Sequence, residues 1–158
     1  MTAKNTFFKP NNTLNCGGKL VDLNRPVVMG ILNVTPDSFY PGSRVNKADK
    51  LLQHALNMVQ EGATILDVGG VSTRPGAKEV TEQAELDRVI PAIEALADNF
   101  PDVVISVDTY RASVVKAAKD AGAGMVNDVS AGRFDEQMYA AVAESGLPYV
   151  LMHMQGKP

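Results

Sequence analysis

The sequence predicts an α/β fold of the (β/α)₈ barrel type, with about the first five β/α units present and a β-hairpin before them. Apolar, strand-like runs alternate with helix-like segments about every 20 to 40 residues, a spacing typical of β/α folds. Five of these runs end in a polar side chain: Asn33, Asp67, Asp108, Asn127 and His153. In a barrel all strands point their carboxyl ends at one site. A doubly wound sheet usually has a Gly-rich turn after its first strand, where this chain has NVTPDSF.

The N-terminal region is expected to differ from the repeated units. Residues 1–12 are predicted to be a polar tail, and residues 13–158 the N-terminal part of a single barrel domain. Apolar residues alternate on both sides of Gly17 and Gly18, which is typical of a hairpin with a two-residue turn. A hairpin cannot serve as a neighbouring strand of a βαβ unit, so we expect it to close one end of the domain.

The remaining elements follow from apolar periodicity and from glycine and proline positions. Apolar residues at i, i+3 and i+4 predict helices, and Gly62, Gly122 and Gly146 are placed to end three of them. Pro91 lies inside the second helical pattern and predicts a kink or a brief break. We expect strands over 27–33, 63–67, 102–108, 124–128 and 147–153, and helices over 48–61, 81–96, 111–121 and 135–145.

Composition bounds the class of protein. A chain of 158 residues can bury the core of one domain, and a net charge of −3 gives no indication of a nucleic-acid partner. No run approaches the ~20 apolar residues of a membrane helix, and the first residues lack the apolar segment of a secretory signal. The single cysteine, Cys16, cannot form an internal disulfide, which fits a cytoplasmic location.

The polar strand ends predict the chemistry of the site. Carboxylate and amide groups at the mouth of an apolar barrel can hold a flat heterocycle by its N–H donors and ring acceptors. Thr73 and Arg74, in the Gly-rich segment GGVSTRPGA, supply donors suited to a phosphate or diphosphate. The amide oxygen of Asn33 is a suitable Mg²⁺ ligand beside phosphate oxygens.

Several of these side chains also have a purely structural interpretation. Asp108 could cap the helix expected from Arg111, and Asp67 could either contact a ligand or brace the loop after its strand. Strand alternation does not decide whether Asn127 or Asp128 points into the barrel.

The histidines and Asp37 are weaker candidates. His153 is more often a packed, hydrogen-bonded core residue than a ligand, and with His54 it makes no zinc site. Asp37 is expected to brace the turn after Pro36.

Four motifs in order, MGILNVTPDSF, LDVGGVSTRPGA, ISVDTYRASV and MVNDVSAG, followed by LMHMQGKP, closely resemble the dihydropteroate synthases of folate biosynthesis. The resemblance covers residues 27–158. It implies a TIM-barrel transferase that joins 6-hydroxymethyl-7,8-dihydropterin diphosphate to 4-aminobenzoate and releases pyrophosphate, with Mg²⁺. It also implies a homodimer at full length.

The resemblance assigns roles to matching positions. Asn33 matches the family's metal and diphosphate asparagine, and Thr73 and Arg74 match its second loop and are the candidate catalytic residues. The remaining matches are to the pterin-binding groups, Asp108 and Asn127 by hydrogen bonds and Met152 by apolar contact, with Asp67 kept as a further substrate-binding candidate.

The chain departs from the family pattern at a few positions. Val71 stands where many members carry Glu, and Tyr40, Pro41 and Ser43 replace the commoner SDGG. The family's later pterin-binding acid, its lysine and its Arg-x-His segment have no counterpart before Pro158, so we expect this chain alone to be inactive. A pterin-dependent methyltransferase and a non-catalytic fragment or binding module are the alternative hypotheses.

Overall fold

The computed structural model describes residues 12–35, 44–71 and 80–153, without the side chains of 44–47. Its centre is a parallel sheet in the strand order β3-β4-β5-β6-β7. The strands are β3 (Val28–Asn33), β4 (Ala63–Gly69), β5 (Val104–Asp108), β6 (Met125–Asp128) and β7 (Tyr149–Leu151). The helices between them are α1 (Arg44–Gln60), α2 (Glu82–Asn99), α3 (Ala112–Asp120) and α4 (Met138–Ser145).

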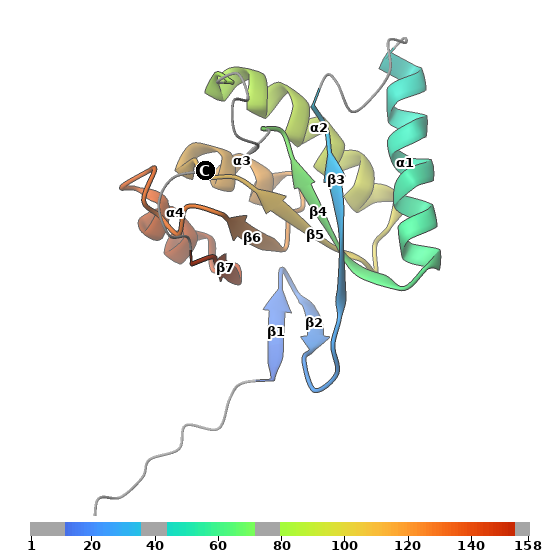
Figure 1. Cartoon of the computed structure of the whole chain (residues 1–158), viewed down its shortest axis with the longest axis horizontal. Coiled ribbons are helices and arrows are strands. Elements are labelled where there is room, and N and C mark those ends of the chain that lie inside the picture. Colours follow the sequence, from blue (N-terminus) through green and yellow to red (C-terminus); the bar gives the residue numbers. More distant parts are fainter. Residues whose placement is uncertain (1–11, 36–43, 72–79, 154–158) are drawn as a thin grey trace, which may run out of the picture.

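The order of the strands distinguishes between the two parallel folds. Each strand pairs with the next one along the chain, and the four helices form an arc on one side of the sheet (Figure 1). A doubly wound sheet reverses its strand order and places helices on both faces, whereas a barrel winds in one direction with its helices outside. The (β/α)₈ prediction is confirmed within the described residues, which contain five parallel strands of such a fold and the four helices between them.

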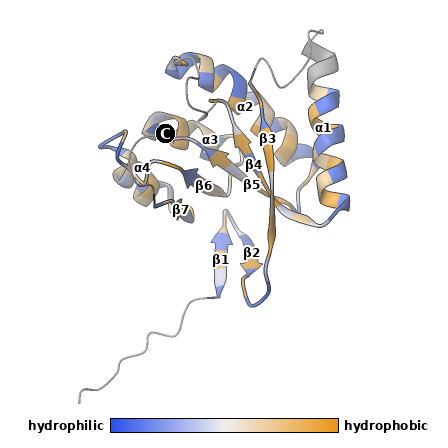
Figure 2. Cartoon of the chain, viewed as in Figure 1, coloured by the Kyte–Doolittle hydropathy of each residue, from blue (hydrophilic) through white to orange (hydrophobic). Residues whose placement is uncertain are grey.

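The main core lies between the sheet and the helices. Strands β3, β4 and β5 are largely apolar, whereas the helices mix polar and apolar residues (Figure 2). Helix α2 shows how this core forms, because Val89, Ile93 and Leu96 recur at helical spacing and are fully buried. The predicted start of this helix is confirmed, since the hydroxyl of Thr81 accepts a hydrogen bond from the Ala84 amide at 3.3 Å.

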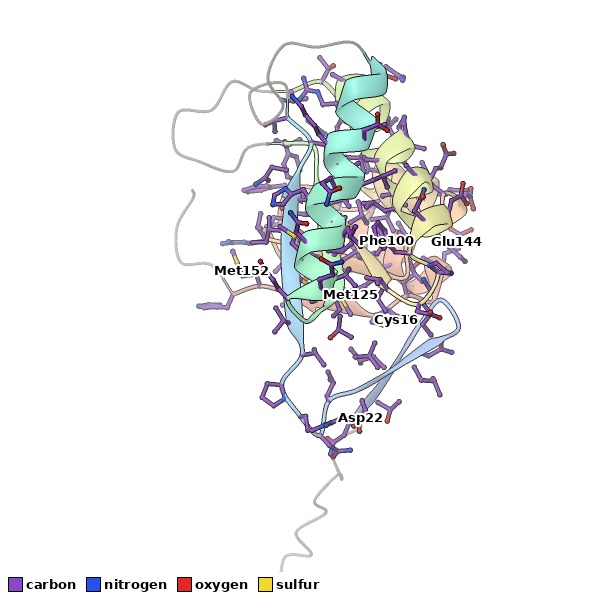
Figure 3. The ribbon with its side chains drawn as sticks, turned by 90° about the vertical axis from the view of Figure 1, so that its right-hand side faces the viewer. Cys16, Asp22, Phe100, Met125, Glu144 and Met152 are labelled. Carbon is purple, nitrogen blue, oxygen red and sulfur yellow. The ribbon has the colours of Figure 1, made fainter. Side chains whose placement is uncertain are left out.

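The hairpin, β1 (Thr13–Cys16) and β2 (Lys19–Asp22), closes one end of the inner face, as predicted. Its Cys16 and Val21 form a second buried cluster with Ile65, Val104 and Met125, which lie near the starts of the central strands. Cys16 lies beside Met125 at the lower end of the sheet (Figure 3). The hairpin therefore covers the end opposite to the polar strand ends, and burial raises the pKa of the Cys16 thiol.

The predicted start of the last helix is wrong. This helix begins at Met138 and not at Asp135, because the Asp135 carboxylate accepts hydrogen bonds from the amides of Ala112, at 2.7 Å, and Gln137, at 2.9 Å, and forms a turn. Of the kink or break predicted at Pro91, the break is not seen, since helix α2 continues through this residue. Pro91 lies on the exposed face, where water can solvate the carbonyl that the proline leaves without an amide partner.

No helix in the described part of the chain combines the length and apolar composition needed to cross a membrane.

The close contact between the hairpin and the sheet predicts a steric effect at Gly124. A Cβ there would lie 2.7 Å from the backbone oxygen of Cys16, so Gly124→Ala must displace the hairpin. We expect a loss of about 1 to 3 kcal/mol in the free energy of unfolding, measured by urea denaturation. Gly30→Ala is the matched control, because its nearest neighbour is the flexible Met58 side chain. Equal losses in both variants would contradict the steric explanation.

Candidate functional site

The register of the parallel sheet brings the polar strand ends into one row. Asn33 pairs with Gly69, Gly69 with Asp108, and Asp108 with Asn127. Residues paired in this way point to the same face of a sheet. Gly69 contributes no side chain, and the space where its Cβ would stand lies 3.3 Å from Asp108 Oδ2 and 3.6 Å from Asn33 Oδ1. The two side chains therefore converge over the space that Gly69 leaves open.

Asp67 lies on the same face of the sheet as this row, two residues before Gly69 in β4. It is 3% exposed, and its Oδ2 accepts a hydrogen bond of 2.9 Å from Asn127 Nδ2, across the intervening strand β5. The contact thus reaches β6, and not the loop that follows β4. Asp67 Oδ1 and the hydroxyl of Ser106 are buried without a hydrogen-bond partner among the described residues. Burial raises the pKa of Asp67, and the hydrogen bond from Asn127 partly offsets that rise.

The pKa of Asp108 is strongly perturbed. Burial, with the negative charges of Asp67, Glu85 and Asp128, raises its pKa to about 7. The capping role considered for Asp108 is not the one seen. The amide of Ala112 in the first turn of α3 is bonded to Asp135 instead, and the amide of Arg111 to the Thr109 hydroxyl at 3.2 Å. The Asp108 carboxylate makes neither capping contact and faces the other side chains of the row.

Asn127 and Asp128 have separate roles. Asp128 is fully buried, and its carboxylate accepts hydrogen bonds from the amides of Ser130, at 2.7 Å, and Gly132, at 2.8 Å, and from the Tyr149 hydroxyl at 2.7 Å. It braces the turn after β6 and ties that turn to β7. Asn127 is consequently the side chain that faces Asp67 and the row.

The other candidates lie elsewhere. His153 is exposed, so the packed-core interpretation of this residue is wrong: it follows the edge strand β7, beside which no further strand of the described chain lies. Met152 is 39% exposed and lies on the side of the sheet away from α1 (Figure 3). Thr73, Arg74 and Asp37 lie outside the described residues.

Sequence reasoning missed two features of this region. Ser106 lies two residues before Asp108, so strand alternation could have placed both on the inner face. The buried ion pair of Glu85 and Arg111 gave no sequence signal, because a glutamate in the first turn of a helix is ordinarily solvated.

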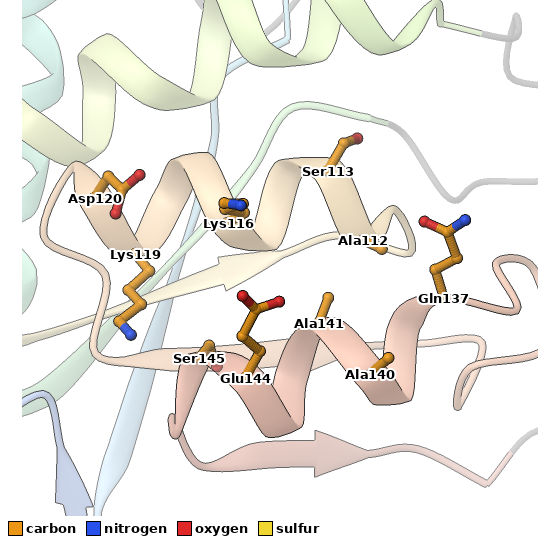
Figure 4. Close-up of a pocket in the computed structure, with 10 residues that line it drawn as sticks. All are labelled: Ala112, Ser113, Lys116, Lys119, Asp120, Gln137, Ala140, Ala141, Glu144 and Ser145. Atoms are coloured by element: carbon orange, nitrogen blue, oxygen red, sulfur yellow. The ribbon is translucent and has the colours of Figure 1, made fainter.

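A groove of about 440 Å³ lies elsewhere, on the outer surface between α3 and α4 (Figure 4). Its lining is made of small residues, of Gln137 and of the charged side chains Lys116, Lys119, Asp120 and Glu144. None of the strand-end side chains lines this groove. The perturbed carboxylates identify the strand ends, and not this groove, as the candidate site.

The geometry supports recognition of a flat polar ring. Carboxylates of Asp67 and Asp108 accept hydrogen bonds when ionised, whereas the amide of Asn127 both donates and accepts. The hydrogen bond of 2.9 Å to Asp67 fixes the Asn127 amide, so the row presents a carboxylate acceptor beside an amide of fixed orientation. Among the described residues no group of three His, Cys, Asp or Glu side chains is placed to hold a metal ion.

Comparison with known proteins gives one consistent result. The family described as pterin binding enzyme matches residues 29–158. The chain is 51% identical over 141 residues to a dihydropteroate synthase of Escherichia coli strain K12, and 49% identical over 138 residues to one of Streptococcus pyogenes serotype M1. These matches cover 89% and 87% of this chain but only 49% and 52% of the relatives. The chain therefore spans about half the length of the curated relatives it matches.

Solved structures agree with this result. The Xanthomonas albilineans dihydropteroate synthase with 4-aminobenzoic acid is 48% identical and superposes with a TM-score of 0.85, over 92% of this chain and 52% of that one. The same enzyme in complex with 7,8-dihydropteroate is 44% identical, with a TM-score of 0.79, over 90% of this chain and 51% of that one.

The raised pKa of Asp108 predicts a pH-dependent stability. The folded chain holds this proton more tightly than the unfolded chain, so its contribution to the free energy of unfolding falls as pH rises from about 4 to about 7. Asp108→Asn removes this pH-dependent loss of stability, because the asparagine side chain does not titrate. Relative to the unsubstituted chain, the variant should gain roughly 2 to 4 kcal/mol between pH 4 and pH 7.5, measured by urea denaturation.

Asp102→Asn is the control for this experiment, since Asp102 is exposed just before the other end of β5. A stability difference for Asp108→Asn that stays constant across this pH range would show that the carboxyl is not perturbed in the folded chain.

Proposed function

The chain belongs to the pterin-binding enzyme family, and we propose that it supplies the pterin site of a dihydropteroate synthase. The reaction condenses 6-hydroxymethyl-7,8-dihydropterin diphosphate with 4-aminobenzoate to give 7,8-dihydropteroate and pyrophosphate. The observation that carries the proposal is the row of Asn33, Asp108 and Asn127 over Gly69, found in a chain about half identical to dihydropteroate synthases. Two structural relatives hold 4-aminobenzoic acid and 7,8-dihydropteroate, which are a substrate and the product of this reaction.

Pterin recognition would use Asp108 and Asn127, at the carboxyl ends of β5 and β6. The ring presents adjacent N–H donors, which suit the carboxylate of Asp108, and ring acceptors, which suit the amide of Asn127. The hydrogen bond from Asn127 to Asp67 fixes the orientation of that amide before the ligand arrives. Such preorganisation reduces the ordering cost of binding. Met152, on the open side of the sheet, would contribute apolar contact to the ring.

The chemical step moves one group between two partners. The bond between the pterin methylene carbon and the diphosphate oxygen breaks, and pyrophosphate leaves with the electron pair. The amine nitrogen of 4-aminobenzoate forms the new bond to that carbon and loses a proton. Asp108 and Asn127 would fix the ring while Thr73 and Arg74 supply donors to the departing diphosphate, so the protein acts through positioning and charge stabilisation.

A magnesium ion fits this arrangement only together with the diphosphate. Asn33 is exposed and offers one neutral amide oxygen toward the gap over Gly69. Mg²⁺ commonly takes one or two protein ligands and completes its octahedral shell with phosphate oxygens and water. Asn33 would be the protein ligand, and the ion would neutralise charge on the leaving group. A cytoplasmic location and a homodimer belong to the same proposal.

We expect the 158-residue chain to bind 6-hydroxymethylpterin through Asp108 and Asn127. Asp108→Ala and Asn127→Ala should each weaken binding about 10- to 100-fold, because each leaves polar atoms of the ring unpaired in a partly buried site. Isothermal titration calorimetry measures the affinities. Asp102→Ala is the control, because Asp102 is exposed just before the start of β5, at the other end of the strand from Asp108. Unchanged affinity in both test variants would place the pterin elsewhere.

The alternatives predict other outcomes. A pterin-dependent methyltransferase would bind the pterin without affinity for pyrophosphate, and a binding module would bind ligands without turnover. We expect the 158-residue chain alone to give no turnover, so the synthase hypothesis is tested on a protein that joins this chain to the later strands of the family: formation of dihydropteroate from the two substrates with Mg²⁺ is followed by chromatography.

Metal binding should depend on the diphosphate. We expect titration of Mg²⁺ into the chain alone to give no measurable heat, and titration in the presence of pyrophosphate to give binding that Asn33→Ala weakens roughly tenfold. Asn57→Ala, on the exposed face of α1, is the matched control. Tight Mg²⁺ binding without pyrophosphate would contradict the single-ligand arrangement.

A further inference from the structure

The side-chain amide of Asn127 is held by its nitrogen and not by its oxygen. Its Nδ2 donates a hydrogen bond of 2.9 Å to Asp67 Oδ2, and Asp67 is buried. An amide side chain can exchange the places of its oxygen and nitrogen with little change of shape, but an ionised carboxylate only accepts hydrogen bonds and can hold the nitrogen alone. The amide oxygen and the second proton of Nδ2 are left for another partner.

This contact lies above an apolar layer of the inner face. Ile65 and Met125 stand two residues before Asp67 and Asn127 in their strands, so they point to the same face of the sheet. Both are buried in the cluster that the hairpin covers. Apolar side chains offer neither donors nor acceptors and exclude water, which strengthens the hydrogen bond between Asn127 and Asp67.

The charge of Asp67 is not matched by a cation. Among the described side chains the one salt bridge joins Glu85 to Arg111. Ser106, which is paired with Asp67 in the register of β4 and β5, is fully buried and neutral. If the amide of Asn127 were reversed, its oxygen would lie against a negative charge that no cation neutralises. The carboxylate therefore favours one orientation of the amide strongly.

The two orientations suit rings of different chemistry. With Nδ2 toward Asp67, Asn127 presents an acceptor beside a donor, next to the carboxylate of Asp108 on the neighbouring strand. A 2-amino-4-oxopteridine has an amino N–H beside a ring-nitrogen acceptor, which pairs with the amide in this order. A 2,4-dioxopteridine has a carbonyl oxygen beside a ring N–H, which is the reverse order. Pairing with that ring requires the amide to turn its oxygen toward Asp67.

We propose that Asp67 is a positioning residue that makes the site selective for 2-amino over 2-oxo rings, by holding the Asn127 amide with its oxygen toward the ligand. The inference rests on the proposed function and deepens it, because it names the part of the ring that is read and the residue that decides the reading. Asp67 acts through Asn127, since it stands two residues deeper in the sheet than the row and is 3% exposed.

The test compares 6-hydroxymethylpterin with 6-hydroxymethyllumazine, its 2,4-dioxo analogue, by isothermal titration calorimetry. We expect the unsubstituted chain to bind the pterin roughly 100-fold more tightly than the lumazine. In Asp67→Asn the new amide can donate to the Asn127 oxygen, so both orientations become accessible and the preference should fall below about tenfold. A merely structural role would weaken the binding of both rings by the same factor.

Asp128→Asn is the matched control. Asp128 is also buried, but its carboxylate accepts hydrogen bonds from backbone amides of the turn after β6 and not from Asn127. Burial and neighbouring carboxylates, Asp67 and Asp128 among them, raise the pKa of Asp108. Removing either charge favours ionised Asp108, which repels a ring carbonyl and would increase the preference for the pterin.

A fall in preference that is confined to Asp67→Asn therefore reports the orientation of the amide. An unchanged preference in Asp67→Asn, or an equal fall in Asp128→Asn, would overturn the proposal.

A measurement without ligand separates this inference from the proposed function. In the unsubstituted chain the Asn127 side-chain amide is bonded to a buried carboxylate, which slows the exchange of its proton with water. This exchange, followed by NMR, should be roughly tenfold faster in Asp67→Asn and in Asp67→Ala, and unchanged in Asp128→Asn. Asp67→Ala leaves the amide without an acceptor and should also lower the preference for the pterin, so it replaces Asp67→Asn if that variant does not fold.

The two measurements fail in different ways. A chain that binds neither ring, but shows the faster exchange in the Asp67 variants, would contradict the proposed function, while the hold of Asp67 on the Asn127 amide would stand. Unchanged exchange in both Asp67 variants would overturn the positioning role even if the synthase reaction is demonstrated.

Discussion

The pairing register of the parallel sheet is the constraint on which the site depends. Because Asn33, Gly69, Asp108 and Asn127 are paired across four strands, their side chains share one face and one level. A shift of one residue in any pair would turn a polar group toward the helices, where the apolar core excludes it. The apolar residues that pack beneath the helices therefore also determine which polar groups meet on the inner face.

The two faces of the sheet divide stability and chemistry between them. The outer face is buried by four helices, and the hairpin buries the lower end of the inner face. Among the described residues, the buried polar atoms without a hydrogen-bond partner are Asp67 Oδ1, the Ser106 hydroxyl and the Ser130 hydroxyl, which lie in the second halves of β4 and β5 and in the turn after β6. Unpartnered buried polar atoms cost free energy, and they are retained where a ligand can satisfy them.

The carboxylates around the site have different roles. Asp128 receives several hydrogen bonds and shapes a turn, and Glu85 is neutralised by Arg111. Asp108 has no such partner among the described residues, and burial and the neighbouring carboxylates raise its pKa to about 7. The braces are satisfied within the protein, whereas Asp108 has capacity left for a ligand.

The sequence by itself determined the strand and helix order, the hairpin, and the strand ends at which Asn33, Asp108 and Asn127 stand. These features follow from local periodicity and from glycine and polar punctuation, which act over a few residues. It could not choose between Asn127 and Asp128, find the contact of Asp67 with Asn127 across a strand, or foresee Glu85 buried against Arg111. Those depend on strand register and on which helix turn packs over which loop, and both are set by contacts between residues far apart in the chain.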